Sequence, residues 1–265
     1  MFGVFLTSSF ARSSLFAGPM YPIGWAAASA IGYIRWLDSI TCRGRYGGIP
    51  VGKITEIAGL SGAGKSFMAA QIAANAQKMG KFPVYFDAES AIDPGFLESA
   101  GVDTENLMYI QAISVEKVLE TIETLIDQYE DTQFLFIWDS IAATSSEKEL
   151  ESDFNPQSTM SVKPRIFGKA FPKLTIPLAN GQHTLLLINQ LKTNINVQNP
   201  MAALIEPYIA PGGKAIEYFC SMRIWLTKRK SKAAYLQDDT GLRICLLYTS
   251  PSPRDLSTSR MPSSA

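Results

Sequence analysis

The chain has 265 residues, of which 46% are hydrophobic and 18% are charged, as is typical of a globular protein with a sizeable core. Its 24 basic and 24 acidic side chains balance, so a uniformly basic nucleic-acid-binding surface is excluded and any DNA contact has to be a local patch. Three widely separated cysteines argue against a disulfide framework or a zinc site, and we expect a reducing compartment, the cytoplasm, with no membrane contact. The single histidine, His183, precedes an apolar run, and we expect it in a solvated loop.

The first 34 residues contain no acidic side chain, and residues 13–34 carry no charge at all. A secretory signal, an organellar transit peptide and a membrane anchor are three interpretations of such a segment. Pro19 and Pro22 disfavour a spanning helix, and the first basic residue, Arg12, comes too late for a secretory signal. We therefore expect residues 1–34 to be an N-terminal arm of uncertain origin, followed by one domain over residues 35–246.

The segment Gly59–Ser66 matches the pattern G-x-x-x-x-G-K-[ST] without a mismatch. Such a loop supplies backbone N–H groups, an ammonium and a hydroxyl to a polyphosphate and its magnesium ion. An apolar run over Val51–Ala58 predicts a strand before it, and Lys65–Met79 predicts a helix after it, closed by Gly80. The alternative is a glycine-rich turn that matches by chance. The predicted nucleotide-binding residues of the loop are Gly59, Leu60, Ser61, Gly62, Ala63, Gly64, Lys65 and Ser66.

Continuous apolar runs of strand length follow, which is typical of strands buried on both faces. These runs are Val84–Phe86, Phe134–Trp138, Thr184–Ile188 and Arg223–Thr227. Between the first two, apolar residues recur at helical spacing from Val115 to Tyr129, with Ser114 as the predicted N-cap. The alternation predicts an α/β fold with a mostly parallel sheet and helices on both faces, and ligands bind such sheets at the carboxyl ends of the strands.

Two of the predicted strands end in acidic residues. Asp139 follows the run from Phe134, as in a Walker B motif, where the carboxylate supports the magnesium ion. Glu89 lies just beyond the strand that contains Val84, and it could orient an attacking water as a general base. The alternative for each acid is a helix N-cap or a solvated strand end.

Several further segments complete a pattern in this order and spacing. They are Gly47–Gly59, Asp87–Glu89 with Ala91–Pro94, Trp138–Ala143, Ile188–Gln190 and Pro211–Ala215. Together they resemble the RecA family of recombinases, including phage UvsX-type members, over residues 35 to 245. The resemblance implies a RecA-like P-loop NTPase core that uses ATP and Mg²⁺. It implies a DNA-dependent ATPase that coats single-stranded DNA as a filament and promotes homologous pairing and strand exchange.

The resemblance also assigns roles to individual residues. It implies that Ser66 and Asp139 support the metal ion, and that the catalytic residues are Glu89, Lys65 and Gln190. Gln190 would contact the γ-phosphate and change its partner when that phosphate leaves. For the base, the resemblance implies that Asp93 contacts the adenine edge and Phe96 stacks on the ring, although the sequence alone equally favours a core position for Phe96.

In this family two loops face DNA, and here they span about residues 152–160 and 191–212. The implied DNA-binding residues are Met160, Arg165, Lys192, Gly212 and Gly213, and Lys163, Lys169 and Lys173 either contact phosphates or form a solvated helix face. The segment after the first loop contains Pro164, Pro172 and Pro177. We expect its helix to be kinked or broken, since a proline inside a helix costs about 3 kcal/mol.

Residues 247–265 are rich in serine and proline, and we expect a disordered tail or a product of sequencing-adaptor read-through. The resemblance does not extend to the family's subunit-bridging lysines or to its N-terminal polymerisation helix. Two alternatives to a recombinase core stay open. One is a P-loop ATPase of the hexameric helicase or KaiC type, and the other is a DNA-coating paralogue that binds ATP without useful turnover.

Overall fold

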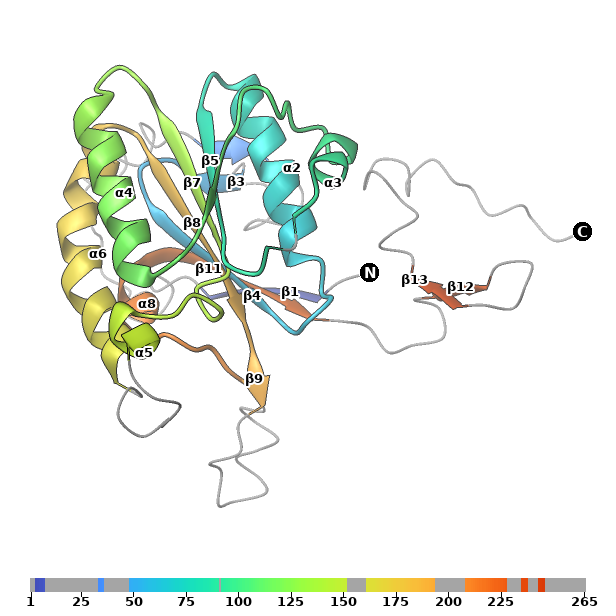
Figure 1. The fold of residues 1–265 in the computed structure, drawn as a ribbon. Helices are drawn as coiled ribbons and strands as arrows, with labels where there is room; N and C mark the ends of the chain where they lie inside the picture. Colours follow the sequence, from blue (N-terminus) through green and yellow to red (C-terminus); the bar gives the residue numbers. More distant parts are fainter. Residues whose placement is uncertain are drawn as a thin grey trace, which may run out of the picture.

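A seven-stranded sheet forms the centre of the computed structural model, which describes residues 3–7, 33–35, 48–90, 92–151, 161–193, 208–227, 235–237 and 243–245. Its strands are β1 (Gly3–Thr7), β4 (Ile54–Gly59), β5 (Phe82–Asp87), β6 (Met108–Gln111), β7 (Phe134–Asp139), β8 (Thr184–Gln190) and β11 (Cys220–Thr227). They lie in the order β1-β11-β4-β8-β7-β5-β6. All neighbours are parallel except β1, which pairs antiparallel with β11, so six strands form a parallel sheet (Figure 1).

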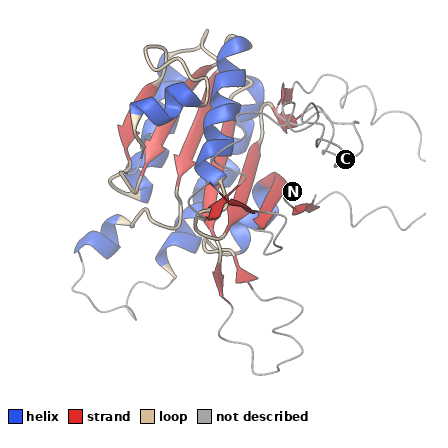
Figure 2. Ribbon diagram, turned by 90° about the vertical axis from the view of Figure 1, so that its right-hand side faces the viewer, coloured by secondary structure: helices blue, strands red, loops and turns tan. Residues whose placement is uncertain are grey.

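Helices cover both faces of this sheet (Figures 1 and 2). One face carries α2 (Lys65–Lys78) and α3 (Pro94–Ser99), and the other carries α4 (Val115–Gln128), α6 (Val162–Asn180) and α8 (Lys214–Phe219). Each face has its own cluster of buried apolar side chains. The predicted α/β fold with a parallel sheet between helical layers is therefore confirmed.

Shorter elements surround this core. They are β2 (Tyr33–Arg35) paired with β3 (Gly48–Pro50), α5 (Glu147–Glu151), β9 (Lys192–Thr193) paired with β10 (Tyr208–Ile209), and β12 (Tyr235–Gln237) paired with β13 (Arg243–Cys245). None of the helices in the described ranges is both long and apolar enough to cross a lipid bilayer.

Local sequence explains where the main elements begin. Ser114 is the N-cap of α4, and its hydroxyl accepts a hydrogen bond from the N–H of Lys117, as predicted. The strand before the glycine-rich loop starts later than predicted, at Ile54 rather than Val51. Gly52 adopts φ +75°, so the chain turns there before it enters the sheet.

The helix after the first loop is continuous from Val162 to Asn180, so of the two expectations, a kinked or a broken helix, the broken helix is wrong. Pro164 lies in the first turn, where its missing N–H has no helical partner in any case. Pro172 and Pro177 lie inside the helix. The buried face of α6 offsets their cost, since burying one large apolar side chain contributes about 1.5–3 kcal/mol. Its fully buried members are Phe167, Phe171, Leu174 and Leu178.

His183 is buried, with 2% of its surface exposed, so the expectation of a solvated loop residue is wrong. Its Nδ1 accepts a hydrogen bond of 3.1 Å from the N–H of Phe134, the first residue of β7. The two rings also stack, with centroids 5.6 Å apart. The imidazole thus accepts a hydrogen bond from a buried backbone N–H at the amino end of β7, at the opposite edge of the sheet from the carboxyl ends of the parallel strands.

We predict that stability falls below neutral pH because of this residue. Burial lowers the pKa of His183, and the positive charge of Lys81 lowers it further. In the unfolded chain the imidazole has its ordinary pKa of about 6.5, so the unfolded state binds more protons as the pH falls from there toward the folded pKa. The free energy of unfolding should fall over that window by up to about 1.4 kcal/mol per pH unit.

Urea unfolding between about pH 7.5 and about pH 5.5 measures this effect. His183→Asn is the comparison, because its amide oxygen can accept from the N–H of Phe134 without titrating. His183 is the only histidine in the chain, so the slope near neutral pH belongs to it. An equal slope in His183→Asn would contradict the assignment.

Candidate functional site

The carboxyl ends of four adjacent strands meet at one edge of the sheet. In the register of the sheet, Asp87 of β5 is opposite Asp139 of β7, and Gly59 of β4 is opposite Gln190 of β8. Glu89 follows β5 by two residues. The residues predicted for phosphate binding, metal support, catalysis and sensing therefore come together at this edge, although they are far apart in the sequence.

The loop between β4 and α2 leaves room for an anion at the start of a 14-residue helix. Gly64 is the N-cap of α2 with φ +83°, and a Cβ placed on it would meet no atom within 4 Å. No side chain caps this helix, and its first turn contains no acidic residue. Backbone N–H groups at an uncapped helix start favour a negatively charged ligand, which fits a phosphate group.

Lys65, the residue predicted to contact phosphate, is the first residue of this helix. It is 7% exposed, and its Nζ donates a 3.0 Å hydrogen bond to the carbonyl oxygen of Leu60 within the same loop. Gly59 has a different reason to be glycine, because a Cβ there would lie 2.9 Å from the carbonyl oxygen of Leu226 on β11. Between them, Ser61 and Gly62 are exposed and Ala63 is buried.

Two neighbouring side chains beside the loop carry oxygen atoms suited to bind a magnesium ion. The hydroxyl of Ser66 donates a 2.6 Å hydrogen bond to Oδ2 of Asp139, and the hydroxyl of Tyr85 donates to the same oxygen at 2.8 Å. Burial raises the pKa of Asp139, while these two hydrogen bonds lower it. The described residues contain no cluster of three or more His, Cys, Asp or Glu side chains that could hold a metal. A hydroxyl and one carboxylate suit Mg²⁺, which retains water and is bound together with phosphates.

Glu89 receives hydrogen bonds from two other strand ends on a single oxygen. Its Oε1 accepts from the hydroxyl of Ser140 at 2.9 Å and also from Nε2 of Gln190. The turn that carries it is fixed by Asp87, whose carboxylate accepts from the N–H of Glu89 at 2.8 Å and from the hydroxyl of Tyr109 at 2.9 Å. The predicted general base and the predicted sensor are thus in direct contact.

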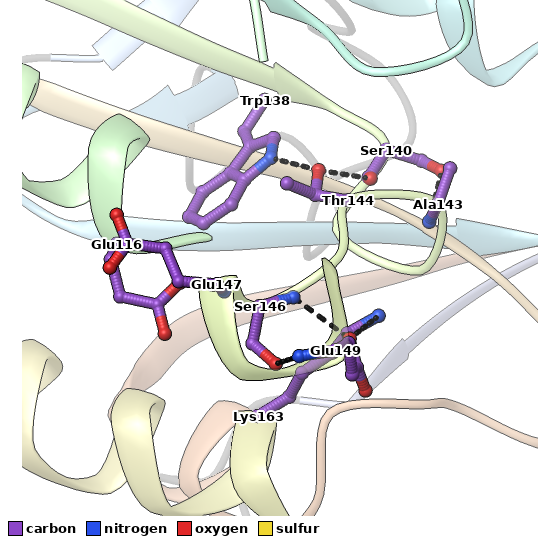
Figure 3. A network of polar contacts seen from close by, with 9 residues as sticks. All are labelled: Glu116, Trp138, Ser140, Ala143, Thr144, Ser146, Glu147, Glu149 and Lys163. Carbon is purple, nitrogen blue, oxygen red and sulfur yellow. Dashed lines mark hydrogen bonds and ion pairs between the residues drawn. The ribbon is translucent and has the colours of Figure 1, made fainter. Parts of the chain in front are cut away.

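Ser140 is a site residue that the sequence analysis did not single out. Its carbonyl oxygen accepts from the hydroxyl of Thr144 at 2.9 Å, and Thr144 in turn accepts from the indole N–H of Trp138 at 2.8 Å (Figure 3). The N–H of Ala143 donates to the hydroxyl of Ser140 at 3.3 Å. Ser140 follows Asp139 directly, so of two consecutive residues at the end of β7 the first contacts Ser66 and the second contacts Glu89. Tyr85 was missed as well.

Asp93 and Phe96, predicted to contact the base, lie at α3. The carboxylate of Asp93 caps this helix by accepting from the N–H of Phe96 at 3.3 Å. Phe96 is half-buried, packs against one core cluster and meets the ring of Phe67 edge-on at 6.2 Å. These contacts give both residues a structural role, and their contact with adenine stays a prediction.

The first predicted DNA loop, residues 152–160 with Met160, lies outside the described residues. Its two flanking helices are joined by an ion pair of 3.4 Å between Glu149 of α5 and Lys163 of α6. Ser146 and Glu149 also exchange hydrogen bonds of 2.8 and 3.2 Å, which fixes the start of α5 (Figure 3). Lys163 is therefore paired at the base of the loop, whereas Arg165 is exposed.

The second predicted loop is described only near its ends, since residues 194–207 lie outside the described part. Lys192 is exposed and belongs to β9, which pairs with β10 and so closes the base of the loop. Gly212 and Gly213 follow β10, and Gly213 is the N-cap of α8. Asn189 contacts this segment, because its Nδ2 donates to the carbonyl oxygen of Pro211 at 2.8 Å.

Comparison with known proteins identifies a family for this chain. The family model "RecA N-terminal domain" matches residues 37–245. Protein RecA of Symbiobacterium thermophilum is 32% identical over 185 residues, which cover 70% of this chain and 51% of the relative. Protein RecA of Aquifex aeolicus and of Rubrobacter xylanophilus are each 35% identical over 178 residues, which cover 67% of this chain and 49% of the relative. The chain spans about half the length of these curated relatives. The glycine-rich loop, the strand ends and this match lead to one conclusion: the chain belongs to the RecA family.

Proposed function

We propose that this chain is the ATPase core of a DNA recombinase. It binds ATP and Mg²⁺ at the edge formed by β4, β5, β7 and β8, and it hydrolyses ATP in a DNA-dependent manner. In the whole protein it coats single-stranded DNA as a filament and promotes homologous pairing and strand exchange. The helix start at Gly64 and the ammonium of Lys65 support the phosphate assignment, and the pair Ser66–Asp139 supports the metal assignment.

The positions of the residues support a role for each of them in this proposal. Lys65 binds the outer phosphate oxygens, and Ser66 and Asp139 support the magnesium ion, which when bound neutralises phosphate charge. Glu89 orients the attacking water and accepts its proton. Ser140 donates to Glu89 and so limits the orientations that this carboxylate can take.

One contact carries the proposal that nucleotide and DNA are coupled: the hydrogen bond from Nε2 of Gln190 to Oε1 of Glu89. Gln190 is the last residue of β8, and the second loop begins at the next residue. An amide can donate to a carboxylate or to a phosphate oxygen, so the γ-phosphate competes with Glu89 for Gln190. A change of partner at Gln190 then changes the start of the loop, which gives ATP and ADP different effects on DNA affinity.

The placement of the loop ends supports DNA as the partner. α5 and the start of α6, between which the first loop lies, are on the same side of the molecule as β9, where the second loop begins (Figures 1 and 2). Arg165 and Lys192 are exposed near these two loop bases and supply positive charge for phosphates.

Gln190→Ala tests the proposal. We expect ATP binding to survive and the difference in single-stranded DNA affinity between the ATP and ADP states, typically about 5–150-fold for coupled sites, to collapse. Fluorescence anisotropy of a short labelled oligonucleotide at fixed salt measures it, since phosphate contacts depend on salt.

The matched control is Gln111→Ala, which removes another glutamine from the carboxyl end of a sheet strand, on β6. Gln111 donates to Ser90 rather than to Glu89, so this variant should keep the full nucleotide dependence. A Gln190→Ala protein that retains the wild-type difference would remove the switch from Gln190. A wild-type chain without DNA affinity in either state would contradict the DNA-binding part of the proposal.

A further inference from the structure

Asn189, the neighbour of Gln190, is a fully buried amide between two hydrogen-bond acceptors. Its Nδ2 donates to Oε1 of Glu56 at 2.8 Å and to the carbonyl oxygen of Pro211 at 2.8 Å. Both neighbours can only accept, so the NH₂ group of the amide has to face them. The same side chain therefore connects β8 with the core strand β4 and with the far end of the second loop.

Glu56 is itself firmly anchored. It is fully buried on β4, and its Oε2 lies 2.5 Å from Nε of Arg223 on the neighbouring strand β11. Nη1 of Arg223 is also 3.9 Å from Oε1 of Glu217 on α8, the helix that follows the loop. A buried carboxylate with a paired arginine does not move easily, because separating the pair would leave a charge without compensation.

We propose that Asn189, held by Glu56, is a positioning residue that ties the far end of the loop spanning residues 191–212 to the tip of β8. This inference rests on the proposed function, in which Gln190 senses the γ-phosphate. When Gln190 changes its hydrogen-bond partner, it acts directly on the start of the loop. Asn189, its neighbour on β8, transmits the resulting movement of the strand tip to the far end of the loop at Pro211. Both ends of the loop then respond to one event at the nucleotide.

Asn189 also has the means to favour a second arrangement of the loop end. Its Oδ1 is buried and has no hydrogen-bond partner among the described residues. A buried acceptor without a donor costs about 1–3 kcal/mol. An arrangement in which a backbone N–H near Pro211 reaches Oδ1 would recover part of that cost, so the amide has a contact to gain when the loop end moves.

Movement of the loop end would reach the first loop as well. Gly213 lies against α6, since a Cβ placed on it would be 3.0 Å from the Cβ of Pro164. Pro164 directly precedes the exposed Arg165, which follows the first loop. The bases of the two loops are thus in contact through the segment that Asn189 holds.

Amide hydrogen exchange tests the inference without DNA. The full chain is compared in its ADP state and with Mg²⁺ and a slowly hydrolysed ATP analogue, on peptides that cover residues 190–193 and 208–214. Wild type should show nucleotide-dependent exchange at both ends, about fivefold or more, as for typical coupling between sites. Asn189→Ala should keep the difference at residues 190–193 and lose it at residues 208–214, whereas Gln190→Ala should lose both.

Thr184→Val is the matched control, because it also changes a buried polar residue of β8, whose hydroxyl has no partner among the described residues. It should keep both responses. If Asn189→Ala does not fold, Glu56→Gln is the variant that tests the role of Asn189, because a neutral amide is a weaker acceptor than a carboxylate. The nucleotide-dependent difference in exchange at residues 208–214 should then fall at least about twofold.

An unaltered far-end response in Asn189→Ala or in Glu56→Gln would overturn the role of Asn189 and leave the proposed function intact. Absence of any nucleotide-dependent exchange in the wild type would overturn both. If the exchange responses are as expected but the wild type does not bind DNA in the separate anisotropy measurement, the proposed DNA partner is contradicted and the role of Asn189 is supported.

Discussion

Lys65→Ala is expected to abolish tight ATP binding while the fold stays intact. Lys65 is only 7% exposed and lies at the start of α2, so in the complex its ammonium would form a largely buried, charge-assisted contact with phosphate oxygens. Truncating one partner of such a contact costs about 2–5 kcal/mol, which is about 30-fold or more in Kd. The hydrogen bond from Nζ to the carbonyl oxygen of Leu60 lies within the loop, so its loss leaves the hydrogen bonds of the sheet in place.

Titration with a fluorescent ATP analogue measures the affinity, and circular dichroism during thermal unfolding reports on the fold. Lys78→Ala is the control, because Lys78 is an exposed lysine at the opposite end of the same helix. It should bind nucleotide like the wild type. Retained affinity in Lys65→Ala, with a normal unfolding transition, would remove Lys65 from the nucleotide site.

Glu89→Gln is expected to slow ATP hydrolysis by about 10²–10⁴-fold, the range for loss of a general base, while ATP still binds. The amide has the shape of the carboxylate, and its oxygen can still accept from Ser140 and Gln190. What it lacks is the negative charge that attracts a proton from the attacking water. Glu89→Gln therefore removes the charge and keeps the shape of the side chain, whereas an alanine variant would remove both.

Single-turnover hydrolysis with enzyme in excess over labelled ATP is the measurement, since it isolates the chemical step from product release. Glu98→Gln is the matched control, because Glu98 is exposed on α3 and accepts from Thr104, away from the strand ends. A rate in Glu89→Gln equal to wild type would mean that another group positions the water. A wild-type chain that binds ATP and shows no turnover would favour the alternative of a DNA-coating paralogue.

The sequence predicted the parallel sheet well, because its strands are continuous apolar runs and its first crossover follows a loop that matches the phosphate-binding pattern without a mismatch. It failed where tertiary packing overrides a local rule. Pro172 and Pro177 disfavour a helix locally, yet the buried face of α6 outweighs them. His183 is polar and precedes a strand, and only the position of β7 beside it shows that its ring accepts a buried N–H.

Prediction of the candidate site was limited in a similar way. Asp139 and Glu89 could be proposed because each ends or follows an apolar run, and Gln190 could be proposed from the resemblance to the RecA family. The structure brings all three to one edge. The contact between Asn189 and Glu56 could not be proposed. A glutamate within an apolar strand signals a buried partner, but 133 residues separate it from Asn189, and only the pairing of β4 with β8 makes them neighbours.

The two oxygens of Glu89 have different surroundings, and this asymmetry has a consequence for timing. Ser140 and Gln190 both donate to Oε1, so Oε2 lies outside these two hydrogen bonds and is the oxygen suited to a water molecule. When Gln190 leaves Oε1 for a phosphate, the carboxylate of Glu89 keeps only the hydrogen bond from Ser140 and is freer to turn toward an attacking water. Binding of the γ-phosphate would thus prepare Glu89 for the hydrolysis that removes this phosphate. Under the proposed function, the lifetime of the protein on DNA would depend on this one contact between the sensing amide of Gln190 and the hydrolytic carboxylate of Glu89.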